Sequence, residues 1–74
     1  MHSYELTSAS INKVKRLVTT NALALNTVID LDTYELEWTV PFVFETRVGQ
    51  MLHGSVRGGQ QAYVDLARGT LTLK

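Results

Sequence analysis

The sequence has no cysteine, one proline and only two histidines among its 74 residues. The absence of cysteine excludes a disulfide framework and any thiolate metal site, and two well-separated histidines are too few for a histidine-rich site. We therefore expect no metal and no cofactor. The lack of cysteine also favours an intracellular, cytoplasmic protein.

Long apolar runs and an excess of one charge are missing as well. No stretch approaches the roughly 18 apolar residues typical of a transmembrane helix, and no secretion signal is recognisable, so we expect no membrane association. Seven Lys and Arg residues balance seven Asp and Glu residues, which gives a formal net charge of zero. This balance removes the global positive field that drives non-specific binding to nucleic acid.

The composition that remains is typical of one small globular domain over residues 1–74. Hydrophobic residues make up 45% of the chain and charged residues 19%, outside the ranges of disordered, collagen-like and coiled-coil chains. A core this small rarely supplies more than roughly 3 to 5 kcal/mol of stability. We therefore expect self-association, that is, a homo-oligomer.

Residues 8–20 are predicted to form an amphipathic helix. Apolar residues recur at helical spacing while basic residues lie off the apolar stripe. Ser8 or Ser10 is a suitable N-cap, and Asn21 tolerates the left-handed conformation that commonly ends a helix. The stripe consists of Ile11, Val14, Leu17 and Val18, and the basic residues are Lys13, Lys15 and Arg16.

Beyond Asn21 the apolar period changes to two, which predicts a five-stranded antiparallel meander. The expected strands cover residues 22–31, 34–48, 50–57, 61–67 and 70–74. The fold class is therefore α+β, with one N-terminal helix packed on a curved sheet that either curls toward a partly open barrel or is covered by a second copy. Tyr4 and Leu6 are suited to a further short strand before the helix.

The parity of the apolar residues predicts the first register. A two-residue turn at 32–33 pairs Leu31 with Tyr34 and Ile29 with Leu36, and it places Trp38 and Phe42 on the core face. Asp-Thr is a poorer hairpin turn than Asp-Gly. Pro41 indicates a bulge or an unpaired edge in the second strand.

The same parity argument predicts two further hairpins. A three-residue loop at 58–60 pairs Val56 with Ala62, and a two-residue turn at 68–69 pairs Leu66 with Leu71. On the outer face the first of these registers sets His53 opposite Asp65, with Ser55 nearby. We interpret this group as a surface cluster rather than a catalytic triad, because the open face offers no oxyanion pocket. No catalytic residue is predicted.

The first register also gathers four carboxylates at one corner of the outer face. Asp30 faces Glu35, Glu37 lies diagonally near, and Asp32 sits in the turn. Like charges directly opposed destabilise a sheet, so this acidic corner is a candidate docking patch for a partner with a basic surface. A solvated turn that deters edge aggregation is the simpler alternative, and a hard-cation site is the weakest because no complete calcium loop is present.

The sequence therefore predicts a small non-enzymatic protein-binding module, an inhibitor or adaptor that occupies a partner's surface. Small inhibitors and adaptors, including those of phages and other mobile elements, are commonly single small domains without catalytic or cofactor motifs. The candidate partner-binding residues are Asp30, Asp32, Glu35 and Glu37 for charge, with Val43, Met51 and Tyr63 as apolar anchors.

Two alternatives remain open. A nucleic-acid-binding small barrel would use Lys13, Lys15 and Arg16 as phosphate contacts, and a helix followed by curved strands is similar to the plan of Sm-like RNA-binding rings, whose paired short motifs are missing here. A structural subunit of a larger assembly is the other alternative.

Overall fold

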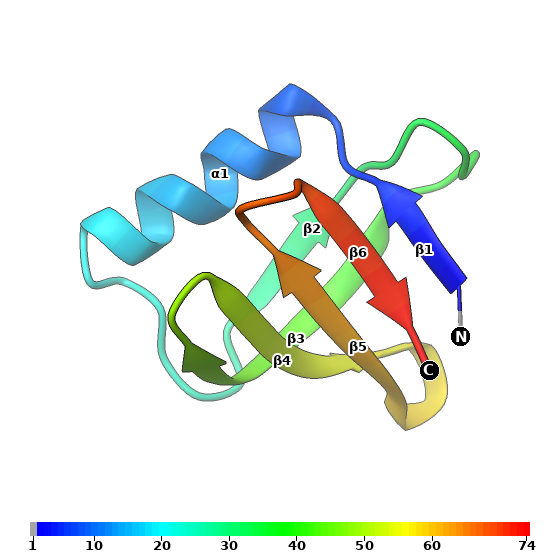
Figure 1. Cartoon of the computed structure of the whole chain (residues 1–74). Helices are drawn as coiled ribbons and strands as arrows, with labels where there is room; N and C mark the ends of the chain where they lie inside the picture. The colour runs from blue at the N-terminus through cyan, green and yellow to red at the C-terminus, as the bar shows by residue number, and fades with distance from the viewer. Residues whose placement is uncertain (1) are drawn as a thin grey trace.

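The chain folds as one helix and a six-stranded antiparallel sheet in a computed structural model that describes residues 2–74 (Figure 1). The elements are β1 (His2–Glu5), α1 (Ser8–Thr19), β2 (Val28–Leu31), β3 (Val40–Val48), β4 (Met51–Val56), the short 3-10 turn η1 (Arg57–Gly59), β5 (Gln60–Asp65) and β6 (Thr70–Leu73). The predicted α+β fold with a curved antiparallel sheet is confirmed. The sixth strand is β1, which contains Tyr4 and precedes the helix.

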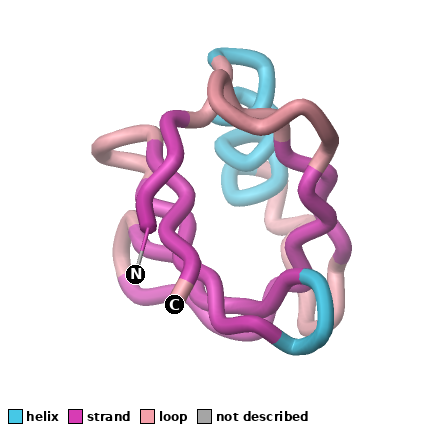
Figure 2. The backbone as a smooth tube through the Cα atoms, turned by 90° about the vertical axis from the view of Figure 1, so that its right-hand side faces the viewer, coloured by secondary structure: helices cyan, strands magenta, loops and turns pink. Residues whose placement is uncertain are grey.

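The sheet curls until its two outermost strands approach each other. The strand order is β1-β6-β5-β4-β3-β2, and every neighbouring pair is antiparallel. An isolated bridge joins Leu6 to Thr33, and the Tyr34 amide donates to the Glu5 carbonyl at 3.0 Å. The strands consequently run around a ring when the molecule is turned (Figure 2).

Helix α1 spans the predicted residues, but its cap differs from the prediction. Thr7, and not Ser8 or Ser10, is the N-cap, and its hydroxyl accepts a hydrogen bond from the Ser10 amide at 3.3 Å. Asn21 follows the helix with φ 59°, the left-handed conformation expected there. Ser10 is fully buried, and its Oγ accepts from the Asp32 amide at 2.7 Å, which ties the helix to the end of β2.

The core lies inside the curled sheet under α1. Its fully buried apolar side chains include Leu6, Val14, Ile29, Leu31, Phe42, Leu52, Val64 and Leu71. Position 54 faces this core and has no room for a side chain, because the Phe42 ring packs against it. A Cβ at Gly54 would lie 2.1 Å from the Val43 carbonyl oxygen and 2.8 Å from the Phe42 ring. The predicted parity is correct for the strand residues among these, whereas Trp38, which it also placed on the core face, is 50% exposed.

The predicted pairing of the first hairpin is wrong by several residues. Leu31 pairs with Val40 rather than with Tyr34, and residues 32–39 form a loop in place of a two-residue turn. The backbone at 32–34 bonds instead to Glu5, to Thr7 and to the Ser10 side chain. These contacts around β1 and α1 replace the tight turn. Residues 22–27, which were predicted as the first part of a strand, are loop.

The two later hairpins are each displaced by two residues from their predicted registers. Val56 pairs with Gln60, so the three-residue loop is Arg57–Gly59 rather than 58–60. Leu71 pairs with Val64 instead of Leu66, so a four-residue turn at 66–69 replaces the predicted turn at 68–69. A shift by two leaves every side chain of these strands on its original face, so the predicted alternation of inward and outward residues is unchanged.

The predicted break between residues 48 and 50 occurs in the β3–β4 hairpin, where Gly49, with φ 59°, separates the strands. The register is irregular between Phe44 and Thr46 and not at Pro41, where a bulge was one of the two predicted alternatives. Pairing of β3 with β4 begins only at Val43, so Pro41 lies where β3 has no partner in β4. Proline, which has no amide hydrogen, is suited to that position.

Candidate functional site

A pocket of about 120 Å³ opens where β3 and β4 diverge at Pro41. We call it the mouth pocket. The start of β1, the end of β6 and the β4–β5 hairpin lie near this end of the curled sheet, away from α1 (Figure 1). Its walls come from β1, the 32–39 loop, the start of β3, the β4–β5 hairpin and β6, and they include Tyr4, Trp38, Pro41, Val56, Arg57 and Leu73.

Trp38 is the largest side chain that lines the mouth pocket. It keeps 50% of its surface exposed, although the predicted register placed it on the core face. It lies instead in the 32–39 loop, because β2 pairs with β3 only from Val40 onward. The Arg57 guanidinium lies over the Trp38 ring, 5.2 Å from its centroid, in a cation–π contact.

The polar groups of the pocket are few. The Gln60 side-chain amide donates to the Lys74 carbonyl at 3.4 Å, and the Tyr4 ring lies 4.3 Å from the His2 ring. Within residues 2–74 the only ion pair joins Arg68 to Asp65, so no described carboxylate pairs with Arg57. The pocket is thus an apolar and aromatic recess beside one cation, the usual chemistry of a small recognition site.

The outer face carries a different cluster from the one predicted. His53 faces Tyr63 rather than Asp65, and the two rings stack at 4.6 Å with a 12° interplanar angle. Ser55 faces Gln61, and the His53 imidazole Nε2 is hydrogen-bonded with the Gln61 side chain. The Lys74 ammonium lies 5.2 Å from the centre of the Tyr63 ring.

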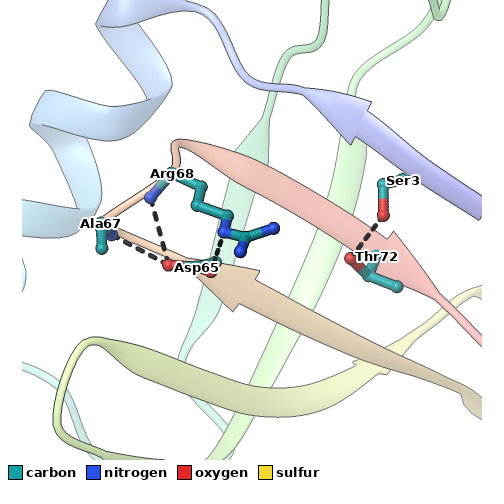
Figure 3. Close-up of polar contacts among 5 residues, drawn as sticks. All are labelled: Ser3, Asp65, Ala67, Arg68 and Thr72. Carbon is teal, nitrogen blue, oxygen red and sulfur yellow. Dashed lines mark hydrogen bonds and ion pairs between the residues drawn. The ribbon is translucent and has the colours of Figure 1, made fainter.

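The Asp65 carboxylate is hydrogen-bonded within the β5–β6 turn. Its Oδ1 accepts from the amides of Ala67 at 3.0 Å and Arg68 at 3.2 Å (Figure 3). The Arg68 side chain approaches the other carboxylate oxygen at 3.9 Å. The carboxylate therefore stabilises a turn, and His53 and Ser55 have no pairing with it.

The acidic corner is not assembled as the sequence predicted. Asp30 faces Pro41 instead of Glu35, because the first hairpin has a different register. Glu35 accepts from the Glu5 amide at 3.1 Å, and Asp32 accepts from the Thr39 hydroxyl at 3.0 Å. Across residues 2–74, no three His, Asp or Glu side chains are grouped so that they could hold a metal ion.

The other predicted contact residues are dispersed. Val43 is half-buried beside Val28 on the outer side of β2 and β3, and Met51 is exposed at the β3–β4 turn. The Lys13 ammonium donates to the Asp30 carbonyl at 2.8 Å, so this lysine is already engaged. Lys15, Arg16 and Glu37 are exposed.

Sequence reasoning missed the mouth pocket, and two signals could have found it. Asp-Thr is a poor hairpin turn, which argues for a longer loop around it. Pro41 predicts an interrupted ladder, and a tryptophan three residues earlier then lies at the interruption. Arg57 and Tyr4 reach the same place only through the hairpin and β1, so no local pattern shows their proximity.

No family model, no curated protein and no solved structure matches this chain. In the part of the chain that the structure describes, α1 has 12 residues, and no helix is long and apolar enough to cross a membrane.

Proposed function

We propose that the protein is a non-enzymatic protein-binding module that acts as an inhibitor or adaptor by holding a segment of another protein in the mouth pocket. The observation that carries the proposal is Trp38, half exposed in an apolar recess with Arg57 over its ring. Tryptophan, tyrosine and arginine are the side chains that most often dominate binding energy at protein interfaces, and Tyr4 supplies the third.

The pocket is suited to a protein segment because its walls are already in place. Trp38 is held by a loop whose backbone is fixed at Thr33 and Tyr34, and Arg57 is held by the β4–β5 hairpin. A recess that is formed before binding loses little conformational entropy when a partner enters.

The charge distribution supports a protein partner over nucleic acid. Arg57 is the one cation among the residues that line the mouth pocket, whereas Asp32, Glu35 and Glu37 lie on the same loop as Trp38. A groove that follows a phosphate backbone needs several cations. The acidic residues of this loop remain our prediction for contacts with a basic surface of the partner.

The test is a selection of random peptides displayed on phage against the immobilised protein. We expect enriched peptides whose affinity falls about 30-fold or more in Trp38→Ala, as for a strong interface residue. Val48→Ala is the matched control, because Val48 is 79% exposed at the β3–β4 turn and does not line the pocket.

Because Trp38 is the only tryptophan in the sequence, its fluorescence reports occupancy of the pocket directly. Peptides that bind wild type and Trp38→Ala equally would contradict the proposal. A salt-sensitive change in Trp38 fluorescence on adding oligothymidine or oligouridine, with no response to any selected peptide, would favour the nucleic-acid alternative instead.

A further inference from the structure

The outer edge of β1 is engaged at one end and free at the other. The Leu6 amide donates to the Gly69 carbonyl at 2.8 Å, so even-numbered residues of this segment direct their backbone groups toward β6. The Thr7 amide donates to the Asp32 carbonyl, and the Glu5 carbonyl accepts from the Tyr34 amide, so odd-numbered residues face the opposite edge. The amide and carbonyl of Ser3 therefore face that edge, and no described residue bonds to them there.

This free edge borders the mouth pocket. Tyr4 pairs with the fully buried Leu71 and His2 with Leu73, so both rings lie on the inner side of the sheet. The Ser3 side chain points to the outer side, where its hydroxyl is hydrogen-bonded with that of Thr72 at 2.9 Å (Figure 3). A strand laid against Ser3 would thus have its neighbouring side chains directed toward the pocket.

The other edge strand, β2, does not combine a free backbone edge with a neighbouring pocket. On β2 the Asp30 carbonyl accepts from the Lys13 ammonium, and the Asp32 amide donates to the Ser10 hydroxyl. Helix α1 therefore covers this part of the edge, one of the usual ways in which proteins block pairing with other chains.

We infer that the bound segment is extended and adds as a strand to β1 at Ser3, an inference that rests on the function proposed above. The partner residue opposite Ser3 exchanges two backbone hydrogen bonds with it, and an adjacent residue inserts an apolar side chain beside Tyr4 and Trp38. Backbone pairing of this kind gives affinity, while the pocket beside it gives specificity.

The charge of the pocket defines the second feature of the segment. Arg57 has no carboxylate partner within the described residues, and its guanidinium is held on the Trp38 ring at the edge of the recess. A carboxylate on the segment, from an aspartate or a glutamate, would pair with it in a charge-assisted hydrogen bond. The occupant is therefore a protein segment that carries an apolar residue and a nearby carboxylate.

The probe is an array of acetylated and amidated seven-residue peptides with threonine at the ends and every combination of residues at the three central positions. We expect the binders to combine one apolar residue with an aspartate or glutamate. In Arg57→Gln the affinity of these peptides should fall about tenfold, while peptides with the acidic residue replaced by its amide should bind both proteins alike.

Backbone pairing is tested separately by methylating one peptide nitrogen at a time. Affinity should fall about tenfold when the residue opposite Ser3 is methylated, and much less when either neighbour is methylated. On the protein, Ser3→Pro removes the free amide hydrogen and should weaken binding about tenfold relative to Ser3→Ala. Both variants lose the hydroxyl bond to Thr72, so their difference reports the change at the backbone nitrogen rather than the loss of the side chain.

The outcomes separate the two proposals. Peptides that need Trp38 but are insensitive to methylation, and that bind Ser3→Pro as well as Ser3→Ala, would overturn strand addition and leave the pocket function standing. Binders without an acidic residue, unaffected by Arg57→Gln, would overturn the carboxylate assignment. If no peptide depends on Trp38, both the proposed function and this inference fail.

Discussion

At the scale of single residues, polar side chains with local hydrogen bonds fix the parts of the chain that strands do not. Thr33 is buried and accepts from the Leu36 amide at 3.0 Å, which shapes the loop that carries Trp38. In the same region, the Ser10 hydroxyl accepts a hydrogen bond from the Asp32 amide. Among residues 2–74 no buried side-chain nitrogen or oxygen lacks a partner, so each of these buried polar groups is compensated.

Asp65 should contribute measurably to stability, whereas its ion-pair partner should not. Asp65→Ala removes the acceptor of two backbone amides in the β5–β6 turn, which we expect to lower the free energy of unfolding by about 1 to 2 kcal/mol. Arg68→Ala should change it by less than about 0.5 kcal/mol, because the Arg68 side chain is 83% exposed and exposed ion pairs contribute little.

Urea unfolding followed by circular dichroism measures both changes, with Arg68→Ala as the matched control for the ion pair. Equal destabilisation by the two substitutions would show that the ion pair, rather than the backbone hydrogen bonds, is the main contribution of Asp65.

At the scale of elements, the 32–39 loop determines both the closure of the sheet and the position of the pocket. Its first residues bond to the chain around β1, and its last residues place Trp38 in the mouth pocket, beside the start of β3. Pro41 then keeps β3 from pairing with β4 before Val43. One loop and one proline thus create the opening that a continuous hairpin would have filled.

The two halves of the β1 edge should differ in hydrogen exchange. The Tyr34 and Thr7 amides lie outside the regular strands, yet both bond to carbonyls across the closure of the sheet, so we expect them to exchange slowly. The Ser3 amide should exchange at close to the rate of an unstructured peptide. Two-dimensional NMR spectra recorded after transfer to heavy water measure all three.

A slow Ser3 amide in the free protein would mean that this edge is already paired, for example in a self-associated form. Fast exchange at Tyr34 and Thr7 would mean that the closure between β1 and the 32–39 loop opens readily in solution.

At the scale of the whole molecule, curling of the sheet resolves the problem that one short helix cannot cover six strands. The strands curl into a ring with α1 at one end (Figure 2). Most apolar side chains of the inner face are buried together inside it, and the strand ends away from the helix leave the mouth pocket. Some apolar surface stays outside: Val28 is 58% exposed beside the half-buried Val43 on the outer face of β2 and β3.

We expect the protein to form a homo-oligomer through this outer face, because a core of this size provides little stability by itself. Light scattering coupled to size exclusion should show a mass that rises with concentration, and Val28→Lys should shift the protein toward the monomer. Val48→Lys is the control, since Val48 is exposed but lies at the β3–β4 turn. A monomer at every concentration would contradict this expectation.

The sequence by itself determined the position of the helix, the antiparallel sheet and the face on which most buried apolar residues lie, whereas Trp38, which the pattern placed on the core face, is half exposed in a loop. These depend on local periodicity, which burial of one face enforces for residues such as Ile29, Phe42 and Val64. Only the tertiary structure decided the registers and the loop lengths. Even-numbered shifts keep every side chain on its face, so the pattern does not distinguish among them. Contacts between distant segments, such as Ser10 with Asp32 and Leu6 with Thr33, select one register and thereby place Trp38 beside Arg57.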